Sequence, residues 1–205
     1  MLKICTDAVA GLSSKTDDNS DTAEHKTLVD SILDSNLPPA EKTVTRLHDE
    51  LGTVTGAAFE TTANSLRCLL YHVYTNPAML EQLRTEIASA KQLVGVAKVS
   101  NMGVSSLEQL PYLTAVLMEG LRLTPGIATR MARIAPDRTV TYGKWQIPVG
   151  TPVGMTTYLM HMDPSMYPEP EKFNPERFLD IDARKKFNKT FAPFSRGSRI
   201  CLGMQ

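Results

Sequence analysis

The C-terminal segment Phe194–Gly203 (FSRGSRICLG) combines a cysteine with glycines and a cation in a pattern suited to metal binding. A thiolate is a good ligand when a loop fixes its sulfur and turns backbone N–H groups toward it. Gly197 and Gly203 allow the tight turn and close backbone approach that such a loop needs. Arg199 could pair with an anionic group beside the metal. The alternative is a Gly-Ser-Arg loop that contains Cys201 by chance.

Glu119 and Arg122 are spaced i and i+3 in an expected helix, where oppositely charged side chains share a face. Most such pairs are solvated and contribute little to stability. The apolar residues around this pair indicate that it is at least partly buried, and a buried pair needs further partners to offset its desolvation. Arg177 is the candidate third member.

Glu60 and Thr61 interrupt an apolar stretch that is expected to be helical. Threonine is a poor helix former, and an unpaired buried carboxylate is costly. A threonine hydroxyl can bond back to a backbone carbonyl and open a local bend. From the residues alone, a functional site is about as well supported as the alternative, which is a helix cap or a solvated polar stripe.

These segments resemble the motifs of the cytochrome P-450 family and follow the family's order. The cysteine loop matches at all five fixed positions, which are Phe194, Gly197, Arg199, Cys201 and Gly203. The resemblance implies that the Cys201 thiolate ligates the iron of haem b (iron protoporphyrin IX). It also implies that Phe194, Arg199 and Gly203 belong to the cofactor site.

The same resemblance implies roles for the other candidates. Glu119, Arg122 and Arg177 are similar to the family's structural Glu-Arg-Arg triad, which supports the haem loop. Glu60 and Thr61 are similar to the oxygen-activation motif of the central helix and would be catalytic, relaying protons to dioxygen.

Arg130 lies at the position where members of the family usually have a cation that binds a haem propionate. The alternative is that Arg130 is a solvated surface residue. The oxygen-activation motif departs from the family at Ala58, where glycine is usual, and at the bulky Phe59 that follows. These residues are expected to narrow the groove for oxygen, without loss of activity.

The helices and strands that we expect to hold these residues indicate a fold that is mainly α with a small β-sheet. It corresponds to part of the cytochrome P-450 fold, with a long central helix, a Glu-Arg helix and the cysteine loop. Pro38 and Pro39 favour a helix start, and a helix from there to Thr75 would be about 50 Å long. Its apolar composition predicts burial on most sides.

The remaining elements follow from turn and capping signals. Asn76-Pro77 predicts a second helix to about Ala90, and Ser105 with Glu108 has capping-box spacing. We further expect an irregular connection at 91–105, a helix from Pro111 to before Thr124, a hairpin at Arg138–Pro148, a strand at 151–160, and an irregular segment from Asp163 to Arg177.

Composition excludes several classes of function. The 205-residue chain has 22 basic and 22 acidic residues, so its formal charge is zero and nucleic-acid binding is disfavoured. Three scattered cysteines indicate a reducing compartment rather than a disulfide framework. No membrane span or signal peptide is expected, and the four histidines lack paired metal-ligand spacing.

The resemblance implies a haem-thiolate monooxygenase that inserts one atom of dioxygen into a small apolar organic substrate, with electrons from NADPH-cytochrome reductase. The amino-acid sequence around the motifs is most similar to that of fungal members of the family that act in secondary metabolism. The alternatives are a truncated, inactive relative and a non-catalytic haem-binding module.

Residues 1–27 are expected to be a polar, flexible lead-in, and residues 28–205 the C-terminal portion of the family domain. Relative to the full-length family, we expect the N-terminal half, including its membrane anchor, and the helix after the cysteine to be absent. The resemblance implies that the full-length protein resides at the cytosolic face of the endoplasmic reticulum membrane, with membrane contact only through the segments expected to be absent.

Overall fold

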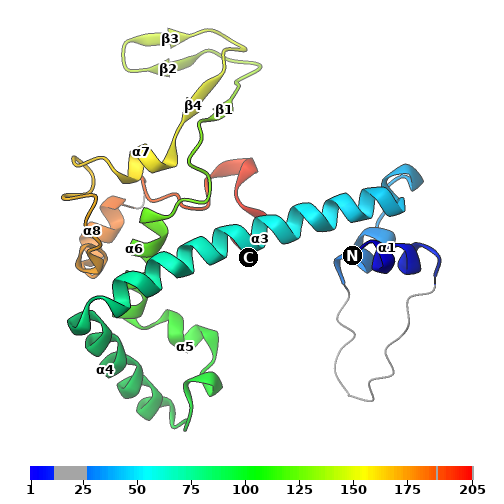
Figure 1. Cartoon of the computed structure of the whole chain (residues 1–205). Coiled ribbons are helices and arrows are strands. Elements are labelled where there is room, and N and C mark those ends of the chain that lie inside the picture. The colour runs from blue at the N-terminus through cyan, green and yellow to red at the C-terminus, as the bar shows by residue number, and fades with distance from the viewer. Residues whose placement is uncertain (12–26, 188, 205) are drawn as a thin grey trace. The chain divides into compact units, whose positions relative to one another are not determined.

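The computed structural model describes residues 1–11, 27–187 and 189–204, which fall into two compact units. The first unit is Met1–Thr62 and the second is Ala63–Gln205. Both are mainly helical, which confirms the predicted fold class, and Figure 1 shows the helices and strands in chain order.

The first unit contains two short helices, α1 (Leu2–Val9) and α2 (Leu28–Leu33). They form a small apolar core in which Cys5, Val29 and Leu47 are buried. Helix α1 was not predicted, and it lies inside the segment expected to be a flexible lead-in. It forms because Cys5 packs into this core. Residues 12–26 of that segment lie outside the described residues.

The long helix α3 spans Val44–Tyr74 and begins later than predicted. Pro39–Lys42 instead forms a 3-10 turn. Thr43 follows with extended backbone (ψ 155°) and separates that turn from the helix. The 31 residues of α3 correspond to about 46 Å at ~1.5 Å per residue.

The predicted burial of the long helix is wrong over residues 52–62, all of which are exposed. Phe59, for example, is 67% exposed. An apolar helix is buried only where other elements cover it, and composition alone does not supply those elements. Among the described residues, no helix has both the length and the hydropathy needed to cross a membrane.

The second unit continues from the C-terminal end of α3 into α4 (Pro77–Val94). The Asn76 side chain accepts a hydrogen bond from the Met79 N–H and caps α4, which runs one turn beyond the predicted end. It stops at Gly95, whose φ of 74° is in the left-handed region that glycine favours.

The connection after α4 is more ordered than predicted. It contains a 3-10 turn at Val99–Asn101 and the short helix α5 (Val104–Glu108). The predicted capping box is wrong, because the N-cap is Gly103 and no side chain caps α5. Ser105 lies inside the helix instead.

Helix α6 (Pro111–Leu123) has the predicted bounds and carries the central contacts of the second unit. One apolar cluster joins it to α3 and α4, through residues that include Leu69, Leu83 and Val116. A second cluster packs Ala115 of α6 against the aromatic residues near the C-terminus. Helix α6 therefore has apolar neighbours on two sides.

The strands form two antiparallel pairs. The predicted hairpin is present as β2 (Val140–Tyr142) and β3 (Trp145–Ile147), joined at Gly143 with φ 56°. The strand expected at 151–160 is shorter, β4 (Val153–Met155), and pairs with β1 (Met131–Arg133). The residues after β4 form helix α7 (Thr157–His161) instead.

The segment after α7 is largely irregular, as predicted, up to a 3-10 turn at Pro175–Phe178. The unpredicted helix α8 (Ile181–Phe187) follows. Its last residue, Phe187, stacks on Tyr167 with ring centroids 4.8 Å apart, which places α8 against the irregular segment.

Candidate functional site

Helix α6 carries a fully buried ion pair between Glu119 and Arg122, whose side chains are both 0% exposed. The guanidinium donates two hydrogen bonds of 2.8 Å, from Nε to Oε2 and from Nη2 to Oε1. The i, i+3 spacing on one helix makes this bidentate geometry possible.

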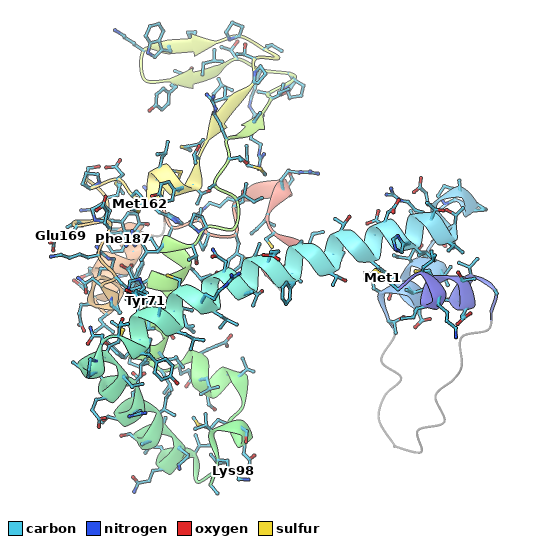
Figure 2. All side chains as sticks on the ribbon, viewed as in Figure 1. Met1, Tyr71, Lys98, Met162, Glu169 and Phe187 are labelled. Atoms are coloured by element: carbon cyan, nitrogen blue, oxygen red, sulfur yellow. The ribbon has the colours of Figure 1, made fainter. Side chains whose placement is uncertain are left out.

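Arg122 also binds the last residue of α7 and the irregular segment that follows this helix. Its Nη1 donates to the carbonyl of His161 at 2.8 Å, and its Nη2 donates to the carbonyl of Lys172 at 3.3 Å. The guanidinium carbon lies 5.4 Å from the centroid of the Tyr167 ring. Figure 2 shows this crowded region beside the labelled Met162, Glu169 and Phe187.

Arg177, on the 3-10 turn at Pro175–Phe178, reaches the same carboxylate. Its Nε lies 3.2 Å from Glu119 Oε1, which also accepts from the backbone N–H of Asn174 at 2.9 Å. Its Nη1 donates to the carbonyl of Pro168 at 2.9 Å. The three residues proposed as a triad therefore meet, and together they fix the irregular segment to α6.

His161 is a central residue of this network that the sequence did not single out. It is 0% exposed at the C-terminal end of α7. Its Nδ1 lies 2.9 Å from the carbonyl of Arg122, and its Nε2 accepts from the N–H of Ala192 at 3.1 Å. Burial lowers the pKa of His161, and the nearby Arg122 charge acts in the same direction.

The cysteine loop begins two residues after Ala192 and is closed by a backbone hydrogen bond of 2.9 Å from Cys201 N–H to the Phe194 carbonyl. Ser195 and Gly197 have φ values of 64° and 77°, so the chain turns sharply between these ends. A 3-10 turn at Gly197–Arg199 fills the loop.

The thiol of Cys201 is free and exposed, so no other described residue blocks its use as a metal ligand. A Cβ on Gly203 would lie 3.8 Å from its sulfur, so glycine keeps the space beside the sulfur open. Phe194 is half-buried at the start of the loop. These features fit a cysteine whose thiolate could bind a metal ion.

Two cations are available to an anionic group in the second unit. Arg130 and Arg199 are both exposed, and neither guanidinium has a hydrogen-bond or ion-pair partner among the described residues. The aliphatic stem of Arg130 packs over Gly154 of β4, where a Cβ would overlap it. The chemistry of these donors fits haem, which needs one thiolate and cations for its two propionates.

Glu60 and Thr61 lie on the exposed part of α3 in the first unit. The Thr61 hydroxyl donates to the carbonyl of Ala57 at 2.8 Å, which is the back-bonding that the sequence suggested. Helix α3 stays continuous through this position.

A groove of about 580 Å³ opens beside the start of the cysteine loop. It is lined mostly by apolar atoms of residues 131–140 and β4, with Ser195 and Arg196 at the loop. Cys201 does not line this groove, so the groove is not assigned as the reaction site.

The fold and the site define a class, a mainly helical protein that presents a free thiol on a tight, glycine-containing loop. Comparison with known proteins identifies the family within that class, because a family model for cytochrome P450 matches residues 2–205. The chain belongs to the cytochrome P450 family.

Curated fungal proteins are similar along most of the chain. N-acetyltryptophan 6-hydroxylase of Emericella nidulans is 41% identical over 184 residues, covering 89% of this chain and 35% of that protein. Fusicoccadiene C-8 hydroxylase of Alternaria brassicicola is 42% identical over 177 residues, covering 86% and 33%. A cytochrome P450 monooxygenase of Aspergillus flavipes is 43% identical over 175 residues, covering 85% and 35%. The chain spans about a third of the length of these relatives.

Proposed function

We propose that this chain supplies the cysteine-ligand portion of a haem-thiolate monooxygenase, which inserts one oxygen atom from dioxygen into an organic substrate. The observation that carries the proposal is the exposed thiol of Cys201 on a loop closed by the Cys201–Phe194 backbone bond. The buried network on α6 supports the segment that leads into this loop.

Cys201 would ligate the iron of haem b through its thiolate, with Gly203 beside the sulfur and Phe194 at the start of the loop. Arg199 and Arg130 would bind the propionates, because both guanidinium groups are exposed and have no described partner. Bound haem would supply dioxygen activation, and an axial thiolate favours cleavage of the O–O bond.

The remaining residues of the site would act on protons and on structure. Thr61 would hold and pass a proton at its hydroxyl, with Glu60 as the adjacent carboxylate that exchanges protons with solvent. Glu119, Arg122 and Arg177 would keep the irregular segment and the loop entry in place without contacting the reacting atoms.

The substrate proposed is a small apolar organic molecule of fungal secondary metabolism. Support for a small organic substrate comes from the relatives, whose names specify hydroxylation of N-acetyltryptophan and of fusicoccadiene, and the second of these is a hydrocarbon. The proposed electron donor is NADPH-cytochrome reductase, and the proposed location of the whole protein is the cytosolic face of the endoplasmic reticulum membrane.

A second candidate, a haem-binding module without turnover, is favoured by one observation. Residues 52–62 of α3, which include Glu60 and Thr61, are exposed in this chain. A proton relay requires a site shielded from bulk water, and an exposed threonine does not provide one.

The experiment is haem titration of the purified chain and of the Cys201→Ser variant, with spectra of the reduced, CO-bound form. Serine is close in size but is a much harder ligand, so we expect it to abolish the thiolate-type Soret band. Cys68→Ser is the matched control, because burial raises the pKa of the Cys68 thiol and opposes ligation. A thiolate spectrum that survives Cys201→Ser would refute the ligand assignment. A thiolate spectrum with no product in the presence of reductase would favour the second candidate.

A further inference from the structure

His161 forms two hydrogen bonds that together require one protonation state. The Arg122 carbonyl can only accept, so Nδ1 of His161 must carry the hydrogen in the 2.9 Å contact. The Ala192 N–H can only donate, so Nε2 must be unprotonated in the 3.1 Å contact. Both bonds exist together only for the neutral ring with its hydrogen on Nδ1.

The contacts between α6 and α7 at this point are reciprocal. Arg122 Nη1 donates to the His161 carbonyl, and His161 Nδ1 donates to the Arg122 carbonyl. The His161 ring also stacks on Phe191, with centroids 5.7 Å apart and planes 19° apart. The ring is therefore held in a fixed orientation before it meets Ala192.

Ala192 lies where the chain enters the cysteine loop. Its carbonyl accepts from the Ser195 N–H at 3.0 Å, and Ser195 has the positive φ that begins the sharp turn. The next closure is the bond from Cys201 N–H to the Phe194 carbonyl. The His161 bond to Ala192 thus fixes the peptide from which the loop departs.

We propose that His161 is a positioning residue, whose neutral Nε2 holds the Ala192 peptide and so sets where the loop of Cys201 begins relative to α6. The inference deepens the proposed function and rests on it, because the loop is taken to carry the haem ligand. The contact between His161 and Ala192 is itself observed in this chain and does not depend on that assumption.

Acid should release this contact. Protonation would place an N–H on Nε2, directly opposite the Ala192 N–H. Burial is the largest effect and lowers the pKa of His161 from 6.5, and the Arg122 charge lowers it further. The carbonyls of Arg122 and Thr190 and the charge of Glu119 oppose this shift, and the Tyr167 ring packs edge-on against the imidazole.

The sign follows from linkage. A histidine whose folded pKa lies below its unfolded value of 6.5 contributes stability that is complete above about pH 6.5. That contribution is lost as the pH falls through the lowered pKa.

Two conservative substitutions separate the two bonds. In His161→Gln, the amide oxygen can take the place of Nε2 and accept from Ala192. In His161→Asn, the shorter amide can replace Nδ1 and donate to Arg122, but it does not reach Ala192. The pair keeps a polar side chain at the site and removes one contact at a time.

The test is amide hydrogen exchange of the whole 205-residue chain, read by mass spectrometry in peptides that cover residues 189–204. We expect His161→Asn to exchange about tenfold faster there at neutral pH, as loss of one hydrogen bond implies, and His161→Gln to stay near the parent. Exchange in α4 should not change in either variant. Equal rates for His161→Asn and His161→Gln would overturn the inference.

The second measurement is pH dependence, corrected for intrinsic exchange. The parent should lose protection at residues 189–204 as the pH falls below 6.5, while His161→Gln should not. A parent with the same pH dependence as His161→Gln would overturn the inference even if His161→Asn failed to fold. Loss of the Cys201 assignment in the haem titration would refute the proposed function and leave this exchange result unaffected.

Discussion

Replacing Glu119 by alanine tests the buried network most directly. The carboxylate accepts hydrogen bonds from Arg122, Arg177 and the Asn174 N–H, and the substitution removes them all. The Arg122 guanidinium, whose side chain is 0% exposed, would be left without its anion.

Removing one partner of a buried ion pair costs about 3–5 kcal/mol of folding free energy. With a denaturant dependence of about 2 kcal/mol per molar urea, the unfolding midpoint should fall by about 2 M. A domain has about 5–15 kcal/mol of stability in total, so a loss of this size would partly unfold a marginally stable second unit even in buffer.

The assay is urea unfolding of the chain followed by far-UV circular dichroism. Glu169→Ala is the matched control, because Glu169 and Lys172 are also spaced i, i+3 but their side chains are 65% and 69% exposed. We expect little change from this control, since exposed pairs contribute little. Glu119→Gln, which keeps one acceptor oxygen, should be intermediate. If Glu119→Ala unfolded at the same urea concentration as Glu169→Ala, the buried network would not stabilise the fold.

Two further substitutions test packing and chemistry. Gly120→Ala should destabilise the chain by about 1–3 kcal/mol in the same urea assay, because its Cβ would overlap the Leu69 side chain. Gly52→Ala, with nothing within 4 Å, should be neutral or stabilising, and equal effects would refute the packing argument. Thr61→Ala, tested in a hybrid with the N-terminal part of N-acetyltryptophan 6-hydroxylase, should keep haem but yield more peroxide and less product per NADPH. Thr53→Ala is its control, because the Thr53 hydroxyl makes the same kind of hydrogen bond, to the Asp49 carbonyl at 2.9 Å. An equal loss of product per NADPH in Thr53→Ala would show that Thr61 has no special role in the reaction.

Local signals predicted much of the second unit. Pro111 and the Thr124-Pro125 pair bounded α6, and Gly143 marked the hairpin, because turns and helix ends depend on residues a few positions apart. The Glu119–Arg122 pair was also local, whereas Arg177 was suggested by family resemblance. The structure places its Nε 3.2 Å from Glu119.

Features that depend on distant residues were missed. His161 gave no signal because its partners, Arg122 and Ala192, lie 39 and 31 positions away. Helix α7 was read as strand because β-type residues precede it, and tertiary contacts of His161 hold it as a helix. The burial predicted for α3 was wrong at residues 52–62. Composition shows that a helix face is apolar enough to be buried, but the face is buried only if neighbouring elements pack against it.

The hydrogen-bond partners of Arg122 and Arg177 determine how well the irregular segment after α7 tolerates changes in sequence. Arg122 and Arg177 bind the backbone carbonyls of Lys172 and Pro168 in the irregular segment after α7, and neither bond uses the side chain of the acceptor. A carbonyl is present whatever residue occupies the position. The irregular segment can therefore drift in sequence while keeping its attachment to α6, provided that its length and path are preserved. Insertions and deletions there should be far more damaging than most single substitutions.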